Sequence, residues 1–104
     1  MNKAMPSIEY LRECFDMNES GLLTWKSRPS HHFVNDVAER RWNSTYAGKP
    51  AGHVGKDGYM VVTLLEHRYR VHRVVFALAN NDDPADCMVD HADGDILNNT
   101  PENL

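Results

Sequence analysis

The sequence predicts a small α+β protein in which short helices pack beside a small antiparallel sheet. Apolar residues at helical spacing follow Pro6, and the run from Tyr59 to Leu65 is rich in aromatic and β-branched residues typical of a strand. From Val74 to Leu78 the apolar spacing becomes helical again. No internal repeat or low-complexity segment interrupts this order.

The length suits one domain and is too short for two independent cores, so we expect a single domain over residues 1–104. We divide it into an N-terminal helix and strand (1–28), a long loop (29–50) and a core that holds the candidate site (51–104). A hydrophobic content of 41% and a charged content of 25% are ordinary for a globular chain.

Neither a membrane span nor a signal peptide is predicted. No apolar run approaches the roughly 18 to 20 residues of a membrane helix, and the first residues lack the apolar stretch of a signal peptide. We therefore expect no membrane partner and a cytoplasmic location. Cys14 and Cys87 form no Cys-x-x-Cys pair, which argues against a zinc ribbon or redox motif and predicts two reduced thiols.

The first predicted helix has Ser7 as its N-cap and ends near residues 16–18. Residues 18–21 read as a turn, and the β-prone residues Leu22–Trp25 as a short strand.

Residues 26–50 lack a clear period and predict a long surface excursion. The adjacent His31 and His32 fall inside it, and two neighbouring histidines on a polar loop are expected to be solvated rather than to bind metal.

The second half predicts a hairpin followed by a helix. The strand Tyr59–Leu65 connects through residues 66–68 to an antiparallel partner at residues 69–71. A helix of two to three turns starts near His72, and residues 80–84 terminate it. Met88 and Val89 then form an extended arm that leads into Asp90 and His91.

Asp90 and His91 together suit metal-assisted phosphodiester hydrolysis. A histidine can deprotonate water near neutral pH, and a carboxylate-bound Mg²⁺ or similar hard cation can stabilise the negative charge that builds up at the phosphate. The side chains of adjacent residues on an extended chain point to opposite sides, so a turn must bring them together, and Asp93-Gly94 can provide it.

This constellation resembles the HNH endonuclease family, in the branch common in phages and self-splicing introns. The likeness covers residues 58–62 through 71–76, and residues 89–91 through 103–104. It implies a ββα-metal motif at the C-terminus, a DNA substrate and a divalent Mg or Mn cofactor. It also implies roles for three residues: Asp90 as metal ligand, His91 as general base and Asn103 as the residue that orients the base.

One departure from the family pattern concerns the last helix. The family continues through a helix whose His or Asn completes the metal coordination, whereas this sequence stops at Leu104. We therefore expect an incomplete motif, which puts metal affinity and catalysis in question.

The remaining polar and aromatic residues near the site are given structural roles. Asn98 and Asn99 are expected to bond local backbone in a loop, and His72 to be a satisfied residue at a strand-to-helix junction. The residues expected to fill the core are Tyr59, Tyr69 and Phe76.

Charge is distributed unevenly along the chain. Residues 1–80 hold all 11 basic residues and 8 acidic ones, whereas residues 81–104 hold 7 acidic residues and no Lys or Arg. The acidic tail argues against tight unaided DNA binding unless metal neutralises it or the bases form one patch. The candidates for phosphate contact are Arg40, Arg41, Lys49, Lys56, Arg68, Arg70 and Arg73.

Two functions from different classes follow. The first is an HNH-like, metal-dependent DNA endonuclease. The alternative is a catalytically inactive relative that acts as a phage-type inhibitor of a host defence complex, working in the host cytoplasm and docking its acidic tail on a basic, nucleic-acid-binding partner.

Overall fold

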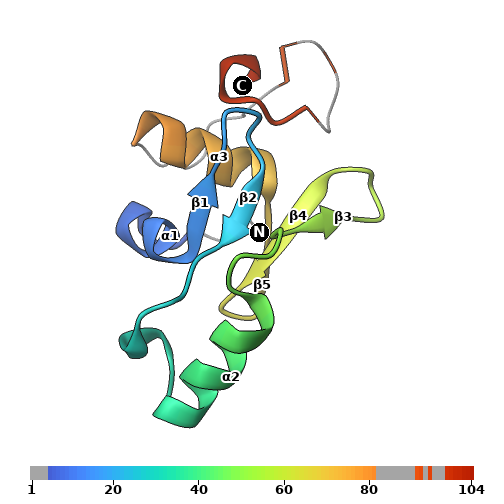
Figure 1. Cartoon of the computed structure of the whole chain (residues 1–104). Coiled ribbons are helices and arrows are strands. Elements are labelled where there is room, and N and C mark those ends of the chain that lie inside the picture. The colour runs from blue at the N-terminus through green and yellow to red at the C-terminus, as the bar shows by residue number, and fades with distance from the viewer. Residues whose placement is uncertain (1–4, 82–90, 93, 95–97) are drawn as a thin grey trace.

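The structure is a computed structural model that describes residues 5–81, 91–92, 94 and 98–104. Helices and two small antiparallel sheets alternate in this part of the chain, which confirms the α+β prediction (Figure 1). The elements in order are α1 (Ile8–Cys14), β1 (Phe15–Met17), β2 (Leu23–Trp25), the 3-10 helix η1 (Ser30–His32), α2 (Asp36–Tyr46), β3 (His53–Val54), β4 (Met60–Leu64), β5 (His67–Arg70), α3 (Val71–Asn80) and the 3-10 helix η2 (Pro101–Asn103).

The N-terminal helix begins where the sequence predicts but ends earlier. The Ser7 hydroxyl accepts a hydrogen bond from the backbone N–H of Tyr10, which caps α1. Phe15 then turns to extended backbone, and β1 pairs with β2 in the register Phe15 with Trp25. The predicted end near residues 16–18 was therefore wrong, because pairing with β2 takes these residues into a strand.

The predicted loop at 29–50 was also wrong in its local structure, since it contains η1 and the 11-residue helix α2. The Asn35 side chain caps α2 by accepting from the backbone N–H of Ala38. None of the α2 residues is buried, and the helix lacks the stripe of buried apolar side chains that would make it recognisable in the sequence. Trp42 attaches the helix to the rest of the molecule through an edge-to-face contact with Trp25, ring centroids 5.0 Å apart.

The segment after α2 joins the two sheets. The N–H of Trp25 donates to the carbonyl of Lys49 over 2.9 Å, and the N–H of Ala51 donates to the carbonyl of Leu23 over the same distance. This segment therefore lies along β2 and leads directly into β3, at the edge of the sheet β3-β4-β5.

A β-β-α succession follows, in β4, β5 and α3, as the sequence predicts. Residues 67–70 pair antiparallel with residues 61–64, and β5 ends at Arg70 where α3 begins at Val71, with no loop between them. Asn81 ends α3 in the left-handed conformation. Cys87 and the predicted arm at 88–89 lie outside the described residues.

The core lies between α1, α3 and the two sheets, and α1 packs directly on α3 (Figure 1). Of the aromatic residues expected in the core, Tyr69 is buried, whereas Tyr59 and Phe76 are half-buried. Among the described residues no helix has the length and apolar character needed to cross a membrane. The largest fully buried side chains in the described part of the chain are Leu11, Cys14, Val62, Val71, Val74 and Val75.

The turn between β4 and β5 is strained, because Leu65 and Glu66 both adopt positive φ, at 51° and 66°. Asn-Gly suits such a two-residue turn better, since these residues tolerate the left-handed region. We expect the double change Leu65→Asn with Glu66→Gly to raise the free energy of unfolding by about 1 kcal/mol. Urea denaturation measures it, and Glu66→Gln, which keeps the backbone preference, is the control. A double variant no more stable than this control would contradict the prediction.

Candidate functional site around His91

His91 is held by a buried amide. Its Nε2 lies 2.8 Å from Oδ1 of Asn99, and Asn99 is only 4% exposed. An amide oxygen can only accept a hydrogen bond, so Nε2 of His91 carries the proton. In the neutral ring the lone pair then belongs to Nδ1, the nitrogen able to take a proton from water.

Two further rings surround His91. The ring of His72 lies 4.8 Å from that of His91 between centroids, and the ring of Tyr59 lies 6.2 Å away. His72 is 5% exposed and takes part in contacts of its own, which agrees with the structural role predicted for it. The guanidinium of Arg70 lies over the Tyr59 ring at 4.1 Å and is paired with Asp57 at 2.7 Å.

The C-terminal segment, here the described residues 91–92, 94 and 98–104, is held together by hydrogen bonds around this histidine. The N–H of Ala92 donates to the carbonyl of Asn103 over 2.7 Å, and the Asn103 amide donates to the carbonyl of Asn98 over 2.9 Å. Asn98 Oδ1 in turn accepts from the backbone and hydroxyl of Thr100. Asn98 thus bonds local backbone as predicted, and these bonds fix where Asn99 lies relative to His91.

The same segment rests on the turn between β1 and β2 (Figure 1). Gly21 has φ +75° and lies so close to Asn99 that a Cβ there would stand 1.8 Å from the Asn99 carbonyl oxygen. The Thr100 hydroxyl also reaches the carbonyl of Ser20 over 3.5 Å. A glycine 70 or more residues earlier in the chain therefore supports the residue that holds His91.

Of the three predicted site residues, the structure describes His91 and Asn103 but not Asp90. His91 lies in the cluster just described, while Asp90 falls outside the described residues. Asn103 lies four residues after Asn99 and is bonded to Asn98 and Ala92 as above, and its role as orienting residue stays a prediction. Sequence reasoning missed Asn99, because two adjacent asparagines look alike until the tertiary structure buries one of them.

The basic residues predicted to contact phosphate are spread over several elements. Arg40 and Arg41 are exposed on α2, and Lys49 and Lys56 are exposed in loops. Arg68 and Arg70 alternate with the buried Tyr69 on β5, which places both on one exposed face as predicted. Arg73 is half-buried on α3.

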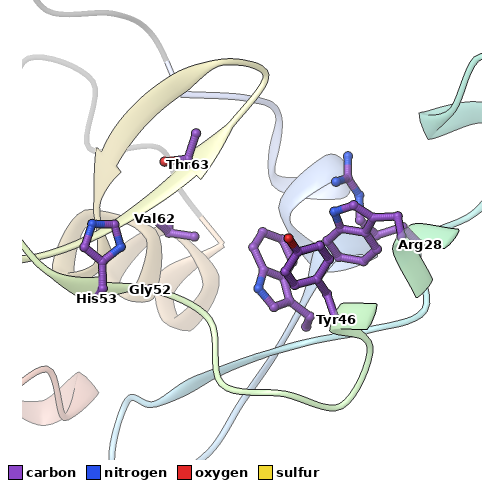
Figure 2. A pocket seen from close by; sticks show the side chains of 8 residues that line it. Arg28, Tyr46, Gly52, His53, Val62 and Thr63 are labelled. Carbon is purple, nitrogen blue, oxygen red and sulfur yellow. The ribbon is translucent and has the colours of Figure 1, made fainter. Parts of the chain in front are cut away.

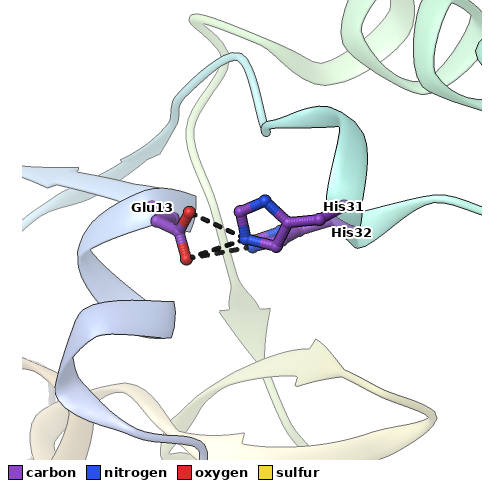
Figure 3. Close-up of side chains that lie close together, drawn as sticks. All are labelled: Glu13, His31 and His32. Atoms are coloured by element: carbon purple, nitrogen blue, oxygen red, sulfur yellow. Dashed lines mark hydrogen bonds and ion pairs between the residues drawn. The ribbon is translucent and has the colours of Figure 1, made fainter.

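The prediction that His31 and His32 are solvated was wrong for His32 alone, since the His31 side chain is 67% exposed. The His32 side chain is fully buried, and both histidines contact the carboxylate of Glu13 at the end of α1 (Figure 3). The reason is tertiary: η1 folds back against α1, which brings together residues 18 positions apart.

An open cavity of about 490 Å³ lies elsewhere, between α2 and the sheet (Figure 2). Its lining includes the indoles of Trp25 and Trp42 with Arg28 and His53. None of the three rings of the His91 cluster lines it. The cavity therefore lies where α2 faces β2 and the strands β3 and β4, and it is separate from the candidate site.

Comparison with known proteins places the His91 cluster in a family context. Residues 69–104 match the HNH endonuclease family, from β5 through α3 to the last residue. The match spans His72, His91, Asn99 and Asn103. No curated protein and no solved structure matches the chain. The match suggests a nuclease-related function. HNH endonucleases typically use a divalent metal. Residues 69–104, about a third of the chain, are similar to the HNH endonuclease family.

Proposed function

We propose that the protein is a metal-dependent DNA endonuclease of the HNH type, with His91 as general base. The observation that carries this proposal is the 2.8 Å hydrogen bond between Nε2 of His91 and the buried Asn99. It fixes the tautomer in which Nδ1 is basic, and general-base catalysis requires a positioned nitrogen in that state. His91 Nδ1 takes a proton from a water molecule, and the water oxygen attacks the phosphorus of the DNA backbone. The bond from phosphorus to the leaving deoxyribose oxygen breaks, and that oxygen takes up a proton from solvent.

The supporting residues act through position. Asn99 holds the imidazole against rotation, and the bonds of Asn103 to Ala92 and Asn98 hold the loop that carries both residues. Asn103 therefore orients His91 through the loop. The buried His72 fills the space beside the ring of His91.

Asp90 is the residue proposed to hold Mg²⁺ or Mn²⁺. The donor set fits such an ion in its chemistry, because hard divalent cations prefer carboxylate oxygens, and Asp90 adjoins the general base in the sequence. When bound, the cation supplies positive charge where the phosphate gains negative charge.

The exposed face of β5 is the proposed DNA contact nearest to the site. Arg68 and Arg70 lie on it, and Arg70 stacks on Tyr59, which is itself a neighbour of His91. Phosphate contacts position the backbone without reading the sequence, so this face would set the register of the scissile bond. Asp57 must release Arg70 for a bidentate phosphate contact.

The experiment that tests the proposal is plasmid nicking with Mg²⁺ or Mn²⁺. We expect the wild-type protein to nick supercoiled plasmid and His91→Ala to lose at least about 100-fold of the rate, because general-base catalysis contributes that much. His53→Ala is the matched control, since His53 is an exposed histidine on β3 outside the cluster. Equal nicking by His91→Ala and His53→Ala would exclude His91 as the base.

The acidic tail favours a second candidate function, the inhibitor of a host defence complex. Residues 81–104 carry seven acidic residues and no Lys or Arg, and a segment of that composition can compete with nucleic acid for a basic protein partner. The same assay separates the two: no nicking by the wild-type protein, together with no DNA binding at low salt, favours the inhibitor.

A further inference from the structure

A second cluster of metal-ligating side chains lies away from the His91 site. Figure 3 shows the carboxylate of Glu13, at the end of α1, facing the imidazoles of His31 and His32 on η1. Oε2 of Glu13 lies 3.0 Å from Nε2 of His31, and Oε1 lies 3.4 Å from Nε2 of His32. One ligand atom from each of the three residues lies within 4.8 Å of the other two.

We propose that Glu13, His31 and His32 bind one zinc-class divalent ion that joins α1 to η1. Two histidines and one glutamate are a recurrent protein ligand set for zinc, with the fourth position left to water. Zinc lies about 2.0–2.1 Å from such ligands, so two ligand atoms at the tetrahedral angle are about 3.3–3.4 Å apart. From the single oxygen Oε1 of Glu13, Nε2 of His31 lies 3.3 Å away and Nε2 of His32 lies 3.4 Å away, which matches that spacing.

His32 is prepared for this role by its surroundings. Its side chain is fully buried, and its ring stacks on that of Tyr10 at 4.2 Å with 13° between the planes. Burial lowers the pKa of His32, although the hydrogen bond to Glu13 opposes that effect. Metal binding requires a neutral imidazole, and the stacked ring already has a fixed orientation.

Zinc binding at Nε2 of His32 requires a change of tautomer. The Nε of Arg28 donates to Nδ1 of His32 over 3.0 Å, so the ring proton is on Nε2 in the metal-free state. With zinc on Nε2 the ring proton would be on Nδ1, so the hydrogen bond from Arg28 Nε to Nδ1 would have to break; the bond from Arg28 to the Tyr10 hydroxyl does not involve the ring. Nδ1 then donates to the Cys14 sulfur, 4.0 Å away.

Cys14 supports this arrangement as a thiol. Burial raises the pKa of Cys14 to about 11, so the group is protonated at neutral pH and can both donate and accept a hydrogen bond. It can therefore exchange roles with Nδ1 of His32 when the tautomer changes.

The bound ion would have a structural consequence. Residues 26–35 connect β2 to α2, and α2 has no buried residue of its own. An exposed Glu-His ion pair contributes little to the stability of such a segment. A metal ion bound by Glu13, His31 and His32 would instead fix the end of α1 to η1. Zinc would thus hold η1, and with it the start of α2, against the N-terminal helix.

The test uses untagged, full-length protein and Zn²⁺ alone as the probe. We expect calorimetry to show one bound Zn²⁺ per chain in the presence of excess Mg²⁺, a raised melting temperature on loading, and tetrahedral absorption bands with Co²⁺ in its place. Glu13→Gln and His31→Ala should weaken binding by at least about tenfold. The His31 side chain is 67% exposed, so its removal leaves the fold intact.

Two histidine variants outside the cluster are the controls. His53→Ala and His91→Ala should bind Zn²⁺ like the wild type, and the second also separates this site from the proposed nuclease site. No zinc binding by the wild-type protein would overturn the proposal. Zinc binding that survives both Glu13→Gln and His31→Ala but is lost in His91→Ala would also overturn it, and would assign the ion to the other site.

Discussion

Replacing Gly21 by alanine is expected to detach the C-terminal segment and abolish most of the nicking activity. The new Cβ would stand 1.8 Å from the Asn99 carbonyl oxygen and 2.4 Å from its carbon, so the backbone of Asn99 must move. Positive φ adds strain for any residue with a side chain. We expect a loss of about 2–4 kcal/mol in the free energy of unfolding, measured by urea denaturation.

Gly48→Ala is the matched control for that substitution. Gly48 has a similar positive φ of 82°, but a Cβ there would meet nothing within 4 Å. The control therefore carries the conformational cost without the collision, about 1 kcal/mol, and should keep its nicking activity. Equal losses in the two variants would show that the contact between Gly21 and Asn99 does not support the site.

Asn99→Ala is expected to reduce nicking by about 10- to 100-fold, the usual effect of removing the partner of a site histidine. Without Oδ1 of Asn99 the ring of His91 loses its fixed tautomer, and Nδ1 is no longer reliably the basic nitrogen. Asn99→Asp keeps an acceptor and should retain activity. Because a carboxylate stabilises the protonated imidazole, and the general base must be deprotonated to act, the acidic limb of the pH–rate profile should move to higher pH in that variant.

The adjacent Asn98→Ala separates this effect from a general loosening of the loop. The Asn98 side chain bonds Thr100 rather than the imidazole, so its removal should lower stability more than it lowers the rate. The ¹⁵N chemical shifts of the His91 ring report the tautomer independently of any activity. A wild-type ring protonated on Nδ1 would contradict the assignment.

Local patterns were sufficient to predict much of the fold. The Ser7 cap, the strand beginning near Tyr59 and the helix after Arg70 all depend on neighbours in the sequence, and the structure has all three. Helix α2 was missed because its attachment depends on the distant contact between Trp25 and Trp42. A polar helix without a buried stripe has no hydrophobic period to detect.

In the candidate site, too, the sequence predicts what depends on a local motif and misses what depends on distant contacts. His91 stands in a recognisable motif and was predicted from it. Its partner Asn99 could not be distinguished from Asn98, since only the approach of Gly21 and the fold of the terminal loop bury it. His31 and His32 were assigned to solvent because Glu13 is far away in the sequence, and only the return of η1 to α1 makes them a cluster.

The direct junction between β5 and α3 means that a displacement at the end of the strand passes straight to the first turn of the helix. Arg70 is the last residue of the strand and His72 is in the first turn of the helix, so no compliant hinge separates them. A phosphate that pulls on the Arg70 guanidinium would rotate the base of α3 with it, and the imidazole of His72 lies 4.8 Å from that of His91. Under the proposed function, a phosphate contact at Arg70 would therefore lie two residues from the imidazole that packs on the general base.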